Sequence, residues 1–208
     1  MLHVSRRASS PGPLLAAAFA LLLGAGGAAR AAAPEPVCKD GKKETTADGK
    51  FKSCYLAQDF AVGPYACRAS FKLALHPSGA LKECRLVKPA QVSGVTVKDS
   101  LELYEDGKLR RAVVEDTKAF GDVEARPNDF VTLLPSGKLS RLELTGGMRT
   151  VKGFPCKGNH IYFHENGALR KVQLSEPFKV DGKELPKDTF LCWDATGKRV
   201  EPCGPMTM

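Results

Sequence analysis

The sequence predicts an all-β protein in which tandem antiparallel β-hairpin repeats form an elongated, twisted sheet. Three observations support this fold class: glycine turns recur at a nearly constant interval, the flanks of each turn have strand-like apolar patterns, and no segment after residue 33 has a useful helical periodicity. A single hairpin is only marginally stable in water, so neighbouring units must stack their apolar faces. A β-solenoid with three short strands per unit is the alternative architecture for a repeat of this length.

The repeat is marked by six short turns, each with glycine as its third residue. Their glycines are separated by 30, 28, 30, 30 and 30 residues, a regularity that chance would not produce. We therefore expect one β-repeat domain of about five to six units at residues 47–200, after a cap segment at 34–46 and before a tail at 201–208. The turns lie at residues 47–49, 77–79, 105–107, 135–137, 165–167 and 195–197.

Most of these turns join two predicted strands. From the second turn onward, apolar residues stand six and four positions before the glycine, such as Ile161 and Phe163 before Gly167, which is the period of two expected for a strand with one buried face. Further apolar residues stand two, five and seven positions after the glycine. The second position has the opposite parity to the fifth and seventh, so we predict a β-bulge or a twist near the third and fourth positions.

A second glycine lies between successive hairpins. An apolar residue usually stands one or two positions before it, and an apolar residue or cysteine stands three or four positions after it. This pattern predicts a short third strand or an extended connector in each unit. The five glycines are Gly63, Gly94, Gly121, Gly153 and Gly182.

The segments LELYEDGKLRRAVV (101–114) and IYFHENGALRKVQL (161–174) resemble MORN-like hairpin repeats. The resemblance extends over residues 45–200, although the units are longer than the usual repeat of that family and contain cysteines. It implies a sheet of hairpins that acts as a scaffold or binding surface and shares no catalytic residues with relatives. By analogy with some MORN-like proteins, an antitoxin or immunity role is a further alternative.

Residues 1–33 have the three parts of a secretory signal peptide: the basic pair Arg6 and Arg7, an apolar run at 14–23, and small residues up to Ala33. Cleavage near residues 31–33 removes three arginines and no acidic residue, so the net charge falls from +8 to +5. We therefore expect an exported protein, periplasmic or extracellular, with no transmembrane segment after signal removal.

All seven cysteines follow the predicted signal peptide, and disulfides persist in oxidising compartments. We expect up to three bridges, with one thiol left over because the number is odd. Cys54 with Cys67, and Cys192 with Cys203, are close enough in sequence to staple single hairpins, whereas the pairing of the others stays open. The seven are Cys38, Cys54, Cys67, Cys84, Cys156, Cys192 and Cys203.

Two histidines four residues apart, His160 and His164, have the residue types of a metal or acid/base site. Along a strand, however, four residues span about 13 Å, which is too far for one ion bound at about 2.0–2.1 Å from each nitrogen. His164 also shares its repeat position with His76 and with unrelated residue types in other units. We therefore predict no catalytic residue, no metal site and no cofactor.

Basic residues recur in the short window after each turn and are the only repeated polar feature. In stacked hairpins they would form a column that attracts polyanions such as acidic polysaccharide or lipopolysaccharide. The simpler interpretation, favoured by the sequence alone, is that they keep the sheet soluble and block edge pairing. Aromatic residues do not alternate with them along the chain, so we expect no nucleic-acid partner. The candidate binding residues are Lys108, Arg110, Arg111, Lys138, Arg141, Arg170 and Lys171.

These features predict an exported, non-enzymatic repeat scaffold or interaction module whose partner is an unknown protein or an anionic glycan. A basic-column polyanion binder is one alternative. An enzyme with a site assembled across repeats is another, and it would require a deep pocket lined by polar residues that depart from the repeat pattern. The sequence predicts neither the oligomeric state nor the individual ligand.

Overall fold

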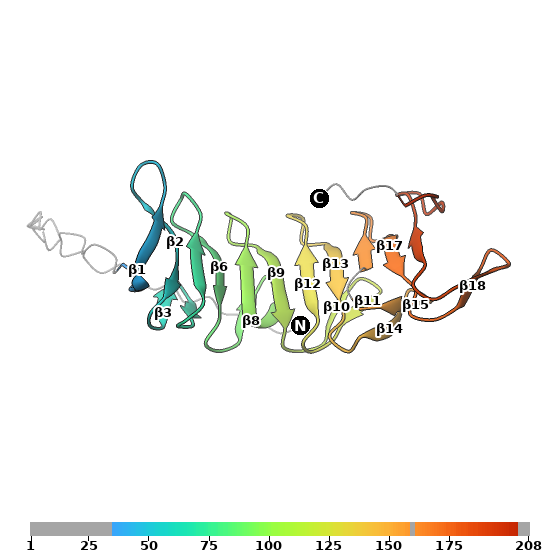
Figure 1. The fold of residues 1–208 in the computed structure, drawn as a ribbon, viewed down its shortest axis with the longest axis horizontal. Coiled ribbons are helices and arrows are strands. Elements are labelled where there is room, and N and C mark those ends of the chain that lie inside the picture. The colour runs from blue at the N-terminus through green and yellow to red at the C-terminus, as the bar shows by residue number, and fades with distance from the viewer. Residues whose placement is uncertain (1–34, 159–160, 204–208) are drawn as a thin grey trace, which may run out of the picture. The chain divides into compact units, whose positions relative to one another are not determined.

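The computed structural model describes residues 35–158 and 161–203. The predicted signal peptide, residues 1–33, and His160 lie outside the described residues. Within them the chain forms twenty strands and no helix, so the all-β prediction is confirmed (Figure 1). None of the described segments is a helix of the length and apolarity that crossing a membrane requires.

Eleven strands form one long antiparallel sheet, in which neighbours along the chain are mostly neighbours in space. The sheet is open: β1 lies at one end, β20 at the other, and the two are not paired. The predicted sheet of tandem hairpins is therefore confirmed. In sheet order the strands are β1 (Cys38–Thr45), β2 (Phe51–Leu56), β5 (Lys72–Leu75), β6 (Leu81–Arg85), β8 (Val95–Leu103), β9 (Leu109–Val114), β12 (Phe130–Leu133), β13 (Leu139–Glu143), β16 (Ile161–Phe163), β17 (Leu169–Gln173) and β20 (Phe190–Cys192).

The six predicted turns lie along one side of this sheet, where its strands end (Figure 1). In the turn at 165–167, His164 N donates to Ala168 O and Gly167 N donates to His164 O, both at 2.9 Å. Gly167 has φ = +83°, a left-handed conformation that residues with a Cβ adopt at a steric cost. A type I turn followed by a residue in this conformation is a common three-residue hairpin loop.

A one-residue bulge follows five of these six turns, as the parity change predicts. Tyr162 pairs with Lys171 but Phe163 pairs with Leu169, so Arg170 is the extra residue. The same register shift occurs in all five hairpins whose strands both belong to the sheet. The bulged residue is always third after the glycine: Lys52, Lys82, Arg110, Ser140 and Arg170.

The second glycines lie in the turns of additional short hairpins. This differs from the predicted single strand or connector: each unit has two more strands of three or four residues, joined by a two-residue turn. Lys152 and Gly153 both have positive φ, as a type I′ turn requires. The pairs are β3 (Phe60–Val62) with β4 (Tyr65–Cys67), β7 (Ala90–Val92) with the start of β8, β10 (Lys118–Phe120) with β11 (Val123–Ala125), β14 (Met148–Val151) with β15 (Phe154–Lys157), and β18 (Phe178–Val180) with β19 (Lys183–Leu185).

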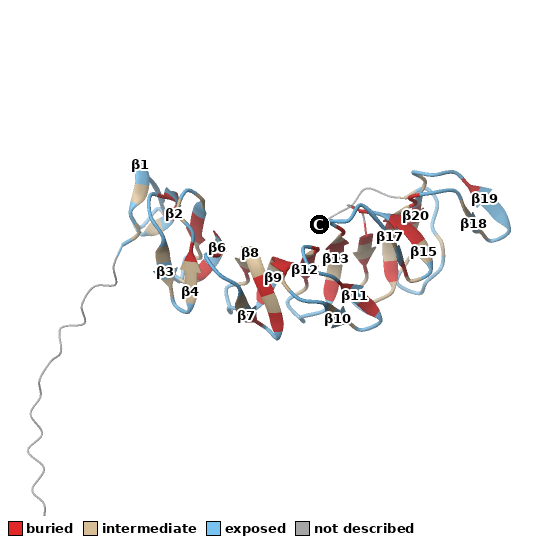
Figure 2. Ribbon diagram, turned by 90° about the horizontal axis from the view of Figure 1, so that it is seen from below, coloured by how far each residue is buried: buried red, intermediate tan, exposed pale blue. Residues whose placement is uncertain are grey.

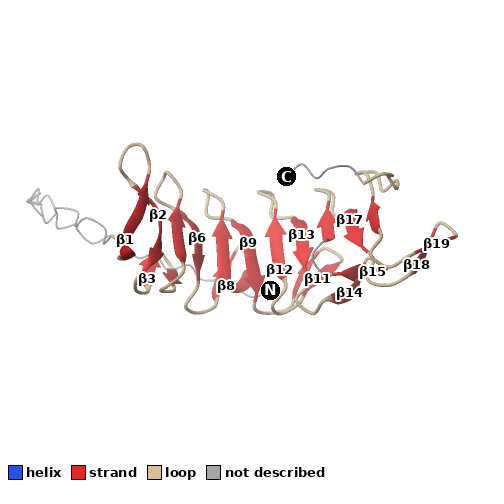
Figure 3. Ribbon diagram, in the orientation of Figure 1, coloured by secondary structure: helices blue, strands red, loops and turns tan. Residues whose placement is uncertain are grey.

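The short hairpins pack against one face of the long sheet, here called the inner face. Figure 2 shows buried positions on both the long sheet and the short hairpins, and strands and loops account for all described residues (Figure 3). Ile161 and Leu142 are fully buried on the inner face, and Val123 and Val151 from short hairpins belong to the same cluster. The core therefore has two layers, the long sheet and the short hairpins on its inner face.

The predicted cap segment at 34–46 contains β1, the first strand of the sheet. β1 pairs with β2, yet seven of its eight residues are exposed, so no buried face imposes an apolar alternation on its sequence. It contains Lys39, Lys42 and Lys43, and lysines on an edge strand discourage pairing with other chains.

Three disulfides form, and Cys156 is the remaining free cysteine. The predicted Cys192–Cys203 bridge is confirmed. The predicted Cys54–Cys67 bridge is wrong: Cys54 bonds to Cys38 across β1 and β2, and Cys67 bonds to Cys84. The reason is that β4 lies beside the end of β6 in the next unit, where Cys67 pairs with Leu86.

Burial protects the Cys156 thiol from reaction. Burial raises its pKa to about 11, so the thiol stays protonated at pH 8, and thiolate is the form that reacts. We expect iodoacetamide at pH 8 to leave Cys156 unmodified in the folded protein and to modify it completely in urea, as measured by mass spectrometry without reduction. Fast labelling of the folded protein would show that this site is open.

Candidate functional site

The face of the long sheet opposite the core, here called the outer face, carries most of the predicted binding residues. Cross-strand pairing places Arg111, Arg141 and Lys171 in one row, separated by Thr132 and Tyr162 on the strands between them. Because the residues of a pair lie directly opposite each other on the same face, the row crosses three repeats.

The other predicted residues lie outside this row. Arg110 and Arg170 occupy bulges beside it, and Lys108 and Lys138 follow the turns. Lys108 Nζ lies 2.7 Å from a carboxylate oxygen of Asp106 in its own turn. Lys138 lines a hollow on the inner side of the sheet. The predicted single column is thus a row of three, two bulge positions and two turn positions.

Two glutamates from neighbouring strands pair with the arginines. Arg111 lies 3.1 Å from Glu143 and 3.7 Å from Glu102, and Arg110 lies 3.6 Å from Glu102. Arg141 lies 3.5 Å from Glu143, so that two carboxylates and three guanidinium groups form one network. All of these groups are partly exposed, and each pair therefore contributes at most about 1 kcal/mol to stability. Their main effect is to hold the guanidinium groups in place.

Aromatic rings lie next to the basic row. Arg111 lies 5.2 Å from the ring centre of Phe130, Arg141 lies 5.3 Å from that of Tyr162, and Lys171 lies 4.4 Å from that of Phe190. Such cation–π contacts are each worth about 0.5–1 kcal/mol at exposed sites. Each basic residue of the row therefore has an aromatic ring next to it, supplied from another strand.

A groove of about 640 Å³ runs over this part of the outer face, and we call it the arginine groove. Side chains from three consecutive repeats line it, with four arginines against two carboxylates. The arginines are Arg110, Arg111, Arg141 and Arg170, and the carboxylates are Glu102 and Glu165. Tyr104 and Tyr162 add aromatic surface and hydroxyl groups to the same groove.

His76 and His164, the two histidines among the described residues, have a structural role. His164 Nε2 lies 2.8 Å from Trp193 O of the next unit, and His76 Nε2 lies 3.0 Å from Leu103 O. Tyr104, at the same repeat position, donates from its hydroxyl to Leu133 O at 2.7 Å. In these three units the position therefore ties the turn to the following unit, which agrees with the prediction that His164 is a structural residue of the sheet.

Sequence reasoning missed the carboxylate and aromatic partners of the arginines. Glu102 and Tyr162 each stand five positions before a turn glycine, and Phe130 stands seven before one, all on strands that precede their turns. Comparing these outward-facing positions between repeats would have identified them as neighbours of the basic window.

No protein-family model matches this chain, and neither a curated protein nor a solved structure shows significant similarity to it.

Proposed function

We propose that this chain is an exported, non-enzymatic β-repeat module that binds an anionic glycan in the arginine groove. The observation that carries the proposal is the convergence of four guanidinium groups from three consecutive repeats on one groove. Guanidinium groups bind carboxylate and sulfate oxygens through paired, charge-assisted hydrogen bonds. Four arginines and two carboxylates line the groove, and with Glu143, which pairs with Arg111 and Arg141, the arginines still outnumber the carboxylates.

The repeat spacing favours a polymeric ligand over a single small anion. Equivalent residues of adjacent units are two strands apart in the sheet, which is about 10 Å at the usual spacing between strands. Arg110 and Arg170, with Ser140 between them, therefore form a second periodic line beside the Arg111 row. A glycan with an acidic group on every sugar, or on every second sugar, presents charges that can match this period.

Export is supported by the three disulfides, which persist in oxidising compartments, and by the signal-like pattern at residues 1–33. We include membership of the MORN-like repeats in the proposal, because the hairpin-and-glycine unit is the feature that resembles them. Use as a binding surface follows from the open outer face.

Binding is favoured over catalysis because Glu102 and His164 in the groove are already engaged in interactions within the protein. Glu102 pairs with Arg110 and Arg111, and the His164 imidazole is bonded to a backbone carbonyl. A general base must be able to reach a substrate proton, and both groups have other partners.

The test is binding of oligogalacturonate to the full chain with its disulfides intact, measured by calorimetry at several salt concentrations. We expect affinity to fall with salt, because partly exposed charges are screened. The double variant Arg110→Gln with Arg170→Gln should weaken binding at least about tenfold, since one hydrogen bond to a charged group contributes about 1.5–3 kcal/mol. Arg111 is left intact because it holds Glu143 in the network.

The matched control is Lys52→Gln with Lys82→Gln. It removes the same charge from the equivalent bulges of the first two hairpins, which lie outside the arginine groove. We expect less than a twofold change in affinity. Equal losses in both double variants, or equally tight binding of neutral dextran, would contradict a specific glycan site.

A further inference from the structure

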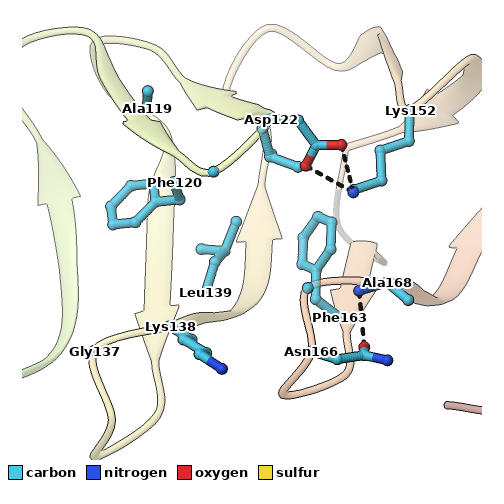
Figure 4. A pocket seen from close by; sticks show the side chains of 13 residues that line it. Ala119, Phe120, Asp122, Gly137, Lys138, Leu139, Lys152, Phe163, Asn166 and Ala168 are labelled. Carbon is cyan, nitrogen blue, oxygen red and sulfur yellow. Dashed lines mark hydrogen bonds and ion pairs between the residues drawn. The ribbon is translucent and has the colours of Figure 1, made fainter.

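A second hollow lies on the inner side of the sheet, away from the arginine groove. It has a volume of about 730 Å³ and lies between the tip of the β10–β11 hairpin and the turns at 135–137 and 165–167 (Figure 4). Phe120, Leu139 and Phe163 form its apolar wall, and Lys138 and Lys152 lie at its margin (Figure 4).

The preceding unit has a different residue at the equivalent hairpin tip. There Ser93, in the turn of its short hairpin, accepts a hydrogen bond at Oγ from Leu109 N at 3.1 Å. Ser93 stands fourteen residues after its turn glycine and Leu109 stands two after the next one. The equivalent residues one unit later are Gly121 and Leu139. Gly121 has no hydroxyl, so the hairpin tip provides no side-chain acceptor for the Leu139 amide.

The two lysines at the margin differ in charge balance. Lys152 Nζ lies 2.7 Å from a carboxylate oxygen of Asp122, so its charge is balanced within the protein (Figure 4). Lys138 is exposed and forms no ion pair with any residue in the described part of the chain. The hollow thus combines an apolar wall with one unbalanced ammonium group and one amide that lacks the acceptor present in the previous unit.

We propose that this hollow binds a small apolar carboxylate such as a medium-chain fatty acid. The hydrocarbon tail of the fatty acid packs against Phe120 and Phe163, and its carboxylate accepts hydrogen bonds from Leu139 N and Lys138 Nζ. Burial of the hydrocarbon tail supplies most of the binding free energy, at roughly 25 cal/mol per Å² of apolar surface. The two hydrogen-bond donors, Leu139 N and Lys138 Nζ, orient the carboxylate. The site is separate from the proposed glycan groove, with which it shares one lining residue, Phe163.

The experiment measures decanoate binding to the full chain by calorimetry, with decanol as the uncharged comparison. Gly121→Ser restores the hydroxyl that Ser93 provides in the preceding unit, and open space surrounds the position of the added Cβ. We expect Gly121→Ser to weaken decanoate binding at least tenfold. Lys138→Gln, at an exposed position, should weaken decanoate binding severalfold and leave decanol unchanged.

The matched control is Gly63→Ser, at the same tip position of the first short hairpin. Gly63 also has positive φ and open space around an added Cβ, so the backbone strain of the substitution is comparable. Decanoate binding should be unchanged in this variant. Unchanged binding in Gly121→Ser, or decanol binding as tight as decanoate with the same response to Lys138→Gln, would overturn the proposal.

Discussion

Replacing Asp129 with asparagine is expected to lower the free energy of unfolding by about 3–5 kcal/mol, because it leaves a largely buried arginine without its charge partner. Asp129 Oδ2 lies 2.7 Å from Arg149 Nη2, and the two side chains are 4 % and 15 % exposed. The same carboxylate accepts hydrogen bonds from Arg126 N at 2.9 Å and Thr145 N at 3.2 Å. An asparagine amide group would place a second donor against one of these donors.

Urea denaturation followed by circular dichroism measures this loss. Asp188→Asn is the matched control, because Asp188 pairs with Lys157 at 2.8 Å while both side chains are about half exposed. Water screens that pair, so its removal should change stability far less. Similar midpoints for the two variants would show that burial does not distinguish the Asp129 pair. The total free energy of unfolding of a globular domain is about 5–15 kcal/mol, so the expected loss is a large part of the stability.

Replacing Val172 with cysteine is expected to create a fourth disulfide, with Cys156, and to stabilise the protein by about 3 kcal/mol. Cys67 and Cys156 occupy equivalent places: Cys67 pairs with Leu86 and Cys156 pairs with Leu174 in isolated bridges. Cys84, the partner of Cys67, stands two residues before Leu86, and Val172 stands two before Leu174. The free thiol therefore exists because the partner position holds valine.

Free-thiol counting by mass spectrometry and thermal melting with and without reductant test this prediction. The control is Ala112→Cys, which adds a thiol at the same repeat position, where the equivalent partner residue is Val97. That variant should keep two free thiols and gain no stability. Two free thiols in oxidised Val172→Cys would show that the two units differ in backbone geometry.

Local patterns predicted those features that depend on neighbours in sequence. The turn at 165–167 and the bulge at Arg170 follow from a glycine and a parity change within a few residues. The strand β1 was not predicted because seven of its eight residues are exposed. Its sequence therefore lacks the alternation of apolar and polar residues that indicates a strand. The short hairpins were predicted as single segments because strands such as Lys118–Phe120 and Val123–Ala125 are only three residues long.

The candidate site was predicted only in part, because only some of its residues are neighbours in sequence. The basic residues after each turn were visible in the sequence, but their carboxylate and aromatic partners come from other strands. Arg111 and Glu143, for example, are 32 residues apart in the chain and 3.1 Å apart in the fold. The inner hollow depends on a glycine in one hairpin tip and an amide in the next unit, a relation that the sequence alone does not display.

The repeat pattern was enough to predict the all-β class, the thirty-residue unit, the turns, the bulges and the structural role of His164, because each of these shows in the comparison of one unit with another. It did not predict that Cys38 bonds to Cys54 and Cys67 to Cys84, how the short hairpins cover the inner face, or which carboxylates restrain the arginines. Those outcomes depend on how each unit packs against the next. Packing between units is set by the register of strands and the folding back of short hairpins, which bring together residues 17 to 29 positions apart.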